Sequence, residues 1–135
     1  MNPNTLKFIN QLEGFKTRTK ALHWDAKNKA IHDLLDGLHK ELSEYSDRLA
    51  EIALGLDNTM FDGMMVEPKM PAASTADALI IELRLACKDF YRTIPDNIDY
   101  VAIKADCESF LSTLSKYTYL INQVVMGRAY DFNEH

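Results

Sequence analysis

A helical apolar period runs from Ile31 to Leu56, and it constrains the fold of this chain more than any other feature of the sequence. Apolar residues recur there mostly at steps of three or four, which is the pattern of an amphipathic α-helix. These residues are Ile31, Leu34, Leu35, Leu38, Leu42, Tyr45, Leu49, Ile52 and Leu56. The pattern predicts a long helix with one face buried against other helices.

Side chains that can bind metal ions lie beside this apolar stripe. At about 100° per residue, His32, His39, Asp47 and Glu51 project from its flank. Asp47 and Glu51 are four residues apart and can therefore bind the same ion. His32 precedes Asp47 by fifteen residues, which is roughly 22 Å along a helix axis. One ion cannot bind both residues of the same chain.

Two copies of the helix can bring these ligands together if they pack antiparallel about a two-fold axis. Position 32 of one chain then faces position 47 of the other, and the axis passes between His39 and Lys40. Two equivalent sites result, each with histidines from one chain and carboxylates from its partner, as an isologous dimer allows. The spacing permits such a shared site and predicts this dimer.

The same stretch contains a His-Trp pair, a second histidine, an Asp-Gly pair and an Asp-x-x-x-Glu step. These are His23-Trp24, His32, Asp36-Gly37 and Asp47 with Glu51. In this order of residues the chain resembles the mini-ferritins known as DNA-binding proteins from starved cells (Dps). The fifteen-residue step to Asp47 matches the family. The interval between the two histidines is three residues shorter than usual, because the family's Gly-Pro turn is missing. The likeness covers about a quarter of the chain.

The resemblance implies an all-α fold, a ferritin-like antiparallel four-helix bundle with one long crossover between helices two and three. It also implies a ferroxidase that binds ferrous iron at a dimer interface, with zinc as a metal that can substitute. Peroxide or oxygen would take electrons from the iron, and ferric oxide would collect in a shell, usually of twelve subunits. The implied metal ligands are His23, His32, Asp47 and Glu51, with no other catalytic residue and no other cofactor. Asp36 would support these ligands or bind a second iron, and Trp24 would pack beside the site or quench electrons.

A function of a different class is also consistent with the sequence. The chain could be a ferritin-like bundle that acts as an oligomerising or interaction module without metal chemistry. Taken singly, His32, Asp47 and Glu51 are ordinary solvated residues of a helix surface. Their combination with His23-Trp24 favours the metal site. Metal content and assembly size of the purified protein separate the two functions.

Composition limits the partners and the compartment. A length of 135 residues predicts a single domain spanning residues 1–135. The net charge of −5 and the pI near 5.3, with no lysine-rich extension before the first helix, predict weak or no binding to nucleic acid.

Neither a signal peptide nor a membrane-spanning stretch is visible. Cys87 and Cys107 are too few for a disulfide framework, so we expect a cytoplasmic protein with two reduced core thiols.

The boundaries of four helices follow from capping residues and breakers. We expect helices over about 5–25 and 29–55, the second capped by Gly55, and a third that opens at Ser74 with Asp77 and is broken by Pro95. The fourth carries a clean three-and-four repeat and stops at Gly127. Its apolar positions are Ile103, Cys107, Phe110, Leu114, Tyr117, Ile121 and Val124.

The connection over 56–73 has no sustained period and fits the crossover of a ferritin-like bundle. It holds Met60, Met64, Met65 and Met70, which we interpret as adaptable packing. No Glu-x-x-His pair occurs in the expected helices, so the di-iron centre that full ferritins build inside one bundle is not expected. There is also no glycine-rich phosphate loop and no Cys-x-x-Cys zinc pattern.

Overall fold

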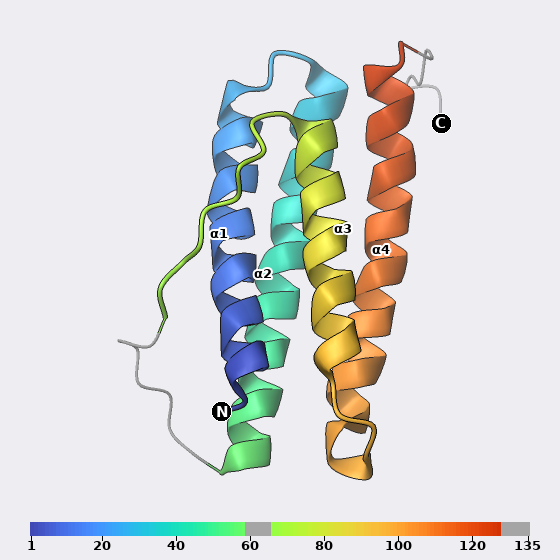
Figure 1. Ribbon diagram of the computed structural model, residues 1–135. Coiled ribbons are helices and arrows are strands. Elements are labelled where there is room, and N and C mark those ends of the chain that lie inside the picture. The colour runs from blue at the N-terminus through green and yellow to red at the C-terminus, as the bar shows by residue number, and fades with distance from the viewer. Residues whose placement is uncertain (59–65, 128–135) are drawn as a thin grey trace.

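The computed structural model describes residues 1–58 and 66–127, and these residues form four α-helices with no strand (Figure 1). A short 3-10 turn, η2 (Ile98–Tyr100), precedes the last helix. The predicted all-helical bundle is therefore confirmed. The helices are α1 (Pro3–Asp25), α2 (Lys29–Asp57), α3 (Ala76–Thr93) and α4 (Val101–Val125).

Polar side chains cap the first three helices at their N-termini. Asn2 accepts a hydrogen bond from the amide of Asn4 at 2.8 Å, and Pro3 occupies the first helical position. Asn28 caps α2 in the same way. The cap of α3 is Thr75 rather than Ser74, so the predicted start was one residue too early.

At the C-terminal ends of the helices, one prediction was wrong and two are confirmed. Gly55 does not cap α2, because the helix continues to Asp57 and ends at Asn58 in the left-handed region, with φ at 48°. Asparagine tolerates this conformation, so no glycine is needed there. Pro95 does follow the end of α3, and Gly127 follows the end of α4 with φ at 67°.

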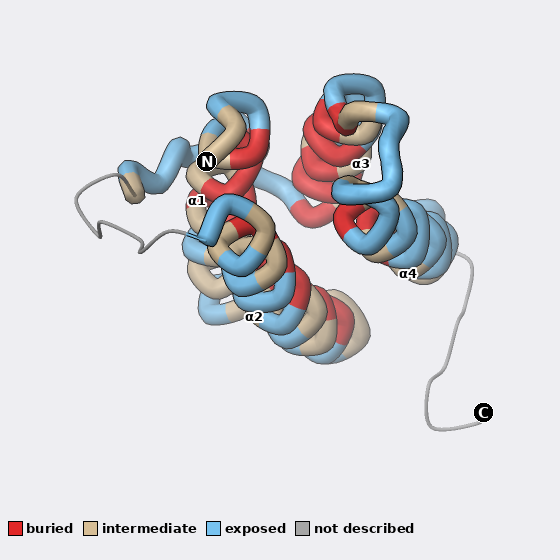
Figure 2. The backbone as a smooth tube through the Cα atoms, turned by 90° about the horizontal axis from the view of Figure 1, so that it is seen from below, coloured by how far each residue is buried: buried red, intermediate tan, exposed pale blue. Residues whose placement is uncertain are grey.

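The four helices surround one shared core. α1 packs on α2 and α3 packs on α4, while α2 also contacts α4 and α1 also contacts α3. In Figure 2 the buried sides of all four helices face the centre between them. The stripe on α2 lies in this core, since Leu38, Leu42 and Tyr45 have no exposed surface. Ile31, Ile52 and Leu56, at its ends, are partly buried against the core.

Stacked aromatic rings join helices across the core. Phe8 of α1 lies over Phe90 of α3 with ring centroids 4.3 Å apart, and Tyr45 of α2 lies over Phe110 of α4 at 4.2 Å. Offset or stacked pairs at such distances add to the burial of their large apolar area. They fix α1 against α3 and α2 against α4.

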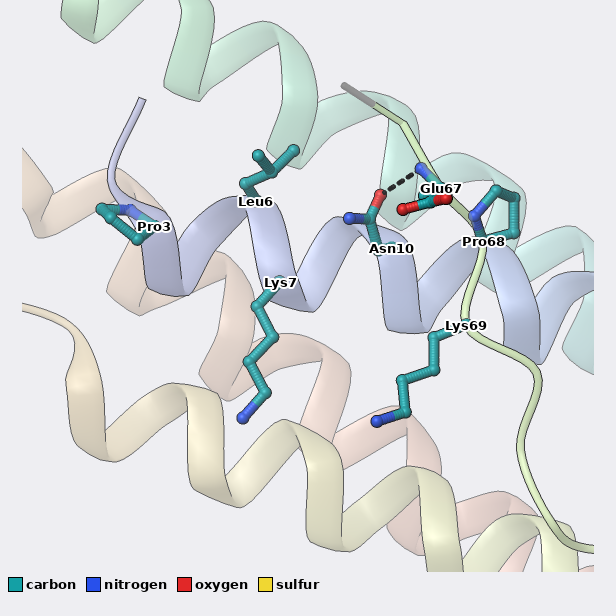
Figure 3. A pocket seen from close by; sticks show the side chains of 7 residues that line it. All are labelled: Pro3, Leu6, Lys7, Asn10, Glu67, Pro68 and Lys69. Atoms are coloured by element: carbon teal, nitrogen blue, oxygen red, sulfur yellow. Dashed lines mark hydrogen bonds between the residues drawn. The ribbon is translucent and has the colours of Figure 1, made fainter. Parts of the chain in front are cut away.

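Residues 66–73 form an extended segment, here called the strap, that lies along α1 on its way to α3 (Figure 1). The amide of Glu67 donates to the side-chain oxygen of Asn10 at 3.0 Å (Figure 3). The amide of Lys69 donates to the main-chain oxygen of Asn10 at 2.9 Å. Arg18 donates to the carbonyl of Ala73 at 3.1 Å. Gly14 allows this approach, because a Cβ there would overlap the carbonyl oxygen of Lys69.

Of the methionines predicted to pack in the connection, Met60, Met64 and Met65 lie outside the described residues. Met70 lies in the strap with 45% of its surface exposed. No helix in residues 1–58 and 66–127 is both long and apolar enough to cross a membrane.

Candidate metal centre

The last turn of α1 and the first turn of α2 bring His23 and His32 together. Each ring donates from Nδ1 to the main-chain carbonyl oxygen of the other residue, at 2.8 Å for His23 and 2.9 Å for His32. The rings stack with centroids 3.8 Å apart and planes 28° from parallel. We call this reciprocal arrangement the histidine clasp. It joins the two helices across the short turn at residues 26–28.

The histidine clasp determines which ring nitrogen can bind a metal. A carbonyl oxygen only accepts hydrogen bonds, so Nδ1 carries the proton in both rings. In a neutral imidazole the lone pair then lies on Nε2. Histidines that bind metals usually donate their other ring N–H to a carbonyl or carboxylate in this manner. Both Nε2 atoms are therefore prepared as ligands.

Asp36, from the next turn of α2, places a carboxylate near His23. Its Oδ1 lies 3.9 Å from Nε2 of His23. When His23 is neutral, both atoms are acceptors, and only a proton or a cation between them makes the arrangement favourable. Metal bonds to nitrogen and oxygen of about 2.1 Å span such a gap with a bent angle at the ion. The His23 side chain is 12% exposed and that of Asp36 is 65% exposed, so the cluster opens to solvent through Asp36.

The two remaining predicted ligands lie elsewhere on the same chain. Asp47 and Glu51 are exposed on α2, off the buried stripe, as the periodicity predicts. Their separation from His32 along α2 is the roughly 22 Å expected from helix geometry. In the described part of the chain, no three His, Cys, Asp or Glu side chains form a group that could hold a metal ion. The structure thus brings His23 against His32, places Asp36 near His23, and leaves Asp47 and Glu51 apart from them.

Two further residues adjoin the cluster. His39 is half-buried on α2, where burial and then the charges of Lys20 and Lys16 lower its pKa. A Cβ added at Gly37 would lie 2.5 Å from the hydroxyl of Tyr117 on α4. Burial, followed by the charges of Glu41 and Asp36, raises the pKa of Tyr117.

Tyr117 was not predicted as a neighbour of the candidate site. In the sequence it is one of seven apolar positions of the α4 repeat, and nothing local distinguishes it. The one sequence feature that pointed to a close contact was Gly37 in the middle of the predicted helix, where glycine lowers helix stability relative to alanine.

A surface hollow of about 600 Å³ lies between the start of α1 and the strap (Figure 3). Its lining includes Lys7, Asn10 and Lys69. Asn10 precedes His23 by thirteen residues of α1, which is about 20 Å along the helix. This hollow is therefore separate from the histidine clasp.

Comparison of the chain with models of known protein families, with curated proteins and with solved structures finds no match.

Proposed function

We propose that this protein is a Dps-like ferroxidase, which oxidises ferrous iron with hydrogen peroxide or oxygen at sites shared across a dimer interface. The observation that carries the proposal is the histidine clasp, which uses Nδ1 of both rings and leaves both Nε2 atoms for ligands, that of His23 lying 3.9 Å from Oδ1 of Asp36. Imidazole together with carboxylate is a ligand set that suits iron.

The clasp favours two ions over one. An imidazole lone pair lies in the plane of its ring, and these two planes are only 28° from parallel. The lone pairs of His23 and His32 therefore do not converge on a single ion. Two ferrous ions can supply, one electron each, the two electrons that hydrogen peroxide takes up.

The charge distribution along α2 supports a partner chain as the source of Asp47 and Glu51. From residue 41 to residue 57 the helix carries five acidic residues and one arginine. From residue 29 to residue 40 it carries two lysines, two histidines and two aspartates. Antiparallel pairing about an axis between His39 and Lys40 places the acidic half of one helix against the histidine half of the other. With neutral histidines the histidine half has no net charge, so this pairing avoids the like-charge repulsion that two facing acidic halves would produce.

Trp24 adds a second argument for a covered surface. Its side chain follows His23 directly and is 71% exposed. Tryptophan is enriched at protein interfaces because it buries a large apolar area. A partner chain that supplies carboxylates to the clasp would also shield this ring from water.

The remaining parts of the proposal are a ferritin-like topology, a dodecameric shell, a cytoplasmic location and weak DNA binding. The path of the strap along α1, and the common direction of α2 and α3 in Figure 1, support a crossover of the ferritin type. The net charge of −5 argues against tight binding to duplex DNA, since phosphate neutralisation supplies most of such affinity.

Metal analysis and light scattering of the purified protein test the proposal together. We expect about two ferrous ions per chain under argon, a stable dimer or larger shell, and iron oxidation on addition of peroxide. A stable oligomer that neither binds nor oxidises iron would support the interaction module instead. A monomer at all concentrations would refute the shared site.

A further inference from the structure

Cys87 of α3 and Cys107 of α4 are neighbours in the buried core. Both are free thiols with no exposed surface. Sγ of Cys107 lies 3.8 Å from the carbonyl oxygen of Cys87. Burial raises the pKa of both thiols, so each retains its proton in the metal-free protein. Neither residue takes part in the proposed iron chemistry.

Tyr45 of α2 reaches the same part of the core, where its ring stacks on Phe110, three residues after Cys107 on α4. The hydroxyl is fully buried and has no hydrogen-bond partner in the described structure. Burial, and then interaction with Cys107, raises the pKa of Tyr45. A buried hydroxyl without a hydrogen-bond partner lowers the stability of the folded chain by about 1–3 kcal/mol. The protonated thiol of Cys107 is a poor acceptor for this hydroxyl.

We propose that Cys87 and Cys107 form a binding site for a monovalent thiophilic metal ion, Cu⁺ in particular, with Tyr45 as a hydrogen-bond donor to the sulfur of Cys107. Soft thiolate ligands select Cu⁺. Structural zinc requires four ligands, whereas the described residues offer no third His, Cys, Asp or Glu to these thiols. A two-coordinate monovalent ion fits a site with two sulfur atoms. This proposal is independent of the iron site.

The binding step balances without electron transfer. Two S–H bonds break, two Cu–S bonds form, both protons pass to the buffer, and copper stays Cu⁺. The product carries one net negative charge on its two sulfurs. The hydroxyl of Tyr45 then donates to a charged acceptor, and hydrogen bonds of this kind are about twice as strong as neutral ones. The hydroxyl that has no partner in the metal-free protein gains one in the copper complex.

Anaerobic titration of the full chain with Cu⁺ against a chromophoric chelator, with X-ray absorption of the loaded protein, tests this site. We expect one equivalent of copper with sulfur neighbours only. Cys107→Ala should lower the affinity at least 100-fold, because one of two ligands is lost. Tyr45→Phe keeps both thiols and should lower it roughly 10-fold. Tyr117→Phe, a tyrosine away from the thiols, is the matched control and should not change it.

The X-ray absorption measurement on the unaltered chain does not depend on any variant folding. Nitrogen neighbours around copper would assign the ion to histidines and overturn the proposal. Equal affinity in the folded Cys107→Ala variant, confirmed by circular dichroism, would also overturn it. Equal affinity in Tyr45→Phe would remove Tyr45 from the site.

Discussion

His23 and His32 are joined by two hydrogen bonds that run in opposite directions, each ring Nδ1–H donating to the other residue's carbonyl oxygen. The same side chains therefore have a structural role through Nδ1 and a chemical role through Nε2. Substitutions that mimic one nitrogen but not the other can separate these roles.

His32→Asn places an amide nitrogen near the position of Nδ1 and has nothing at Nε2. We expect this variant to keep the stability of the native chain within about 0.5 kcal/mol and to lose iron oxidation. His32→Gln removes the donor from the Nδ1 position and should cost about 1 kcal/mol. Urea unfolding and a peroxide-dependent iron oxidation assay measure the two effects. An Asn variant that oxidises iron normally would contradict the role of Nε2.

Gly37 and Tyr117 should be energetically coupled. A Cβ at position 37 would lie 2.5 Å from the Tyr117 hydroxyl and 3.5 Å from the ring carbon that bears it. Gly37→Ala should therefore destabilise the native chain, although alanine is favoured over glycine in a helix by about 1 kcal/mol. In a Tyr117→Phe background the clash is gone, so the same substitution should stabilise. A double-mutant cycle by urea unfolding gives the coupling, and additive effects would contradict this contact.

Two glycines in helices should respond to alanine with opposite signs. At Gly14 the added Cβ would overlap the main-chain carbonyl of Lys69, so Gly14→Ala should displace the strap and destabilise by more than about 2 kcal/mol. At Gly55 nothing lies within 4 Å of the added atom. Gly55→Ala should stabilise by roughly 0.5–1 kcal/mol. Thermal unfolding of both variants checks the pair, and a neutral Gly14→Ala would mean that the strap does not lie on α1 in solution.

His39 should make stability depend on pH. Its pKa is lowered from the ordinary value of 6.5, because burial and the charges of Lys20 and Lys16 outweigh the attraction of Asp36. The unfolded chain then binds this proton more readily than the folded chain, so the contribution to stability falls as pH falls through 6.5 and below. His39→Gln should reduce that slope. Urea midpoints of both proteins over this range measure it, and equal slopes would show that His39 does not titrate differently on folding.

Periodicity alone predicted the parts of the fold that depend on burial. The stripe on α2 is in the core, and Asp47 and Glu51 are exposed beside it. Pro95 and Gly127 marked helix ends because proline and glycine act through local backbone geometry. The end of α2 at Asn58 was not predicted, because Gly55, three residues earlier, is the usual type of residue for a left-handed cap. Gly55 instead lies within the helix, and Asn58 adopts the left-handed conformation.

The histidine clasp could not be predicted from spacing. It depends on the backbone of residues 26–28, which sets the carbonyl of one histidine within reach of the other ring. The shorter interval between His23 and His32 left their relative position open, because a turn can accommodate several lengths. Tyr117 beside Gly37 is a contact between residues eighty positions apart, and no local pattern encodes its partner.

The central claim is that each iron site takes histidines from one chain and carboxylates from its partner, and chain exchange measures it most directly. One variant carries His23→Asn and His32→Asn, and the other carries Asp47→Asn and Glu51→Gln. Each alone should be inactive and folded, because the first keeps the clasp donors and the second changes exposed residues. After exchange, half of the dimers contain one chain of each kind, and each of these has one intact site of two. Activity should recover to roughly a quarter of that of the native protein. A mixture that stays inactive after verified exchange would contradict the shared site, as would carboxylate variants that oxidise iron at the native rate.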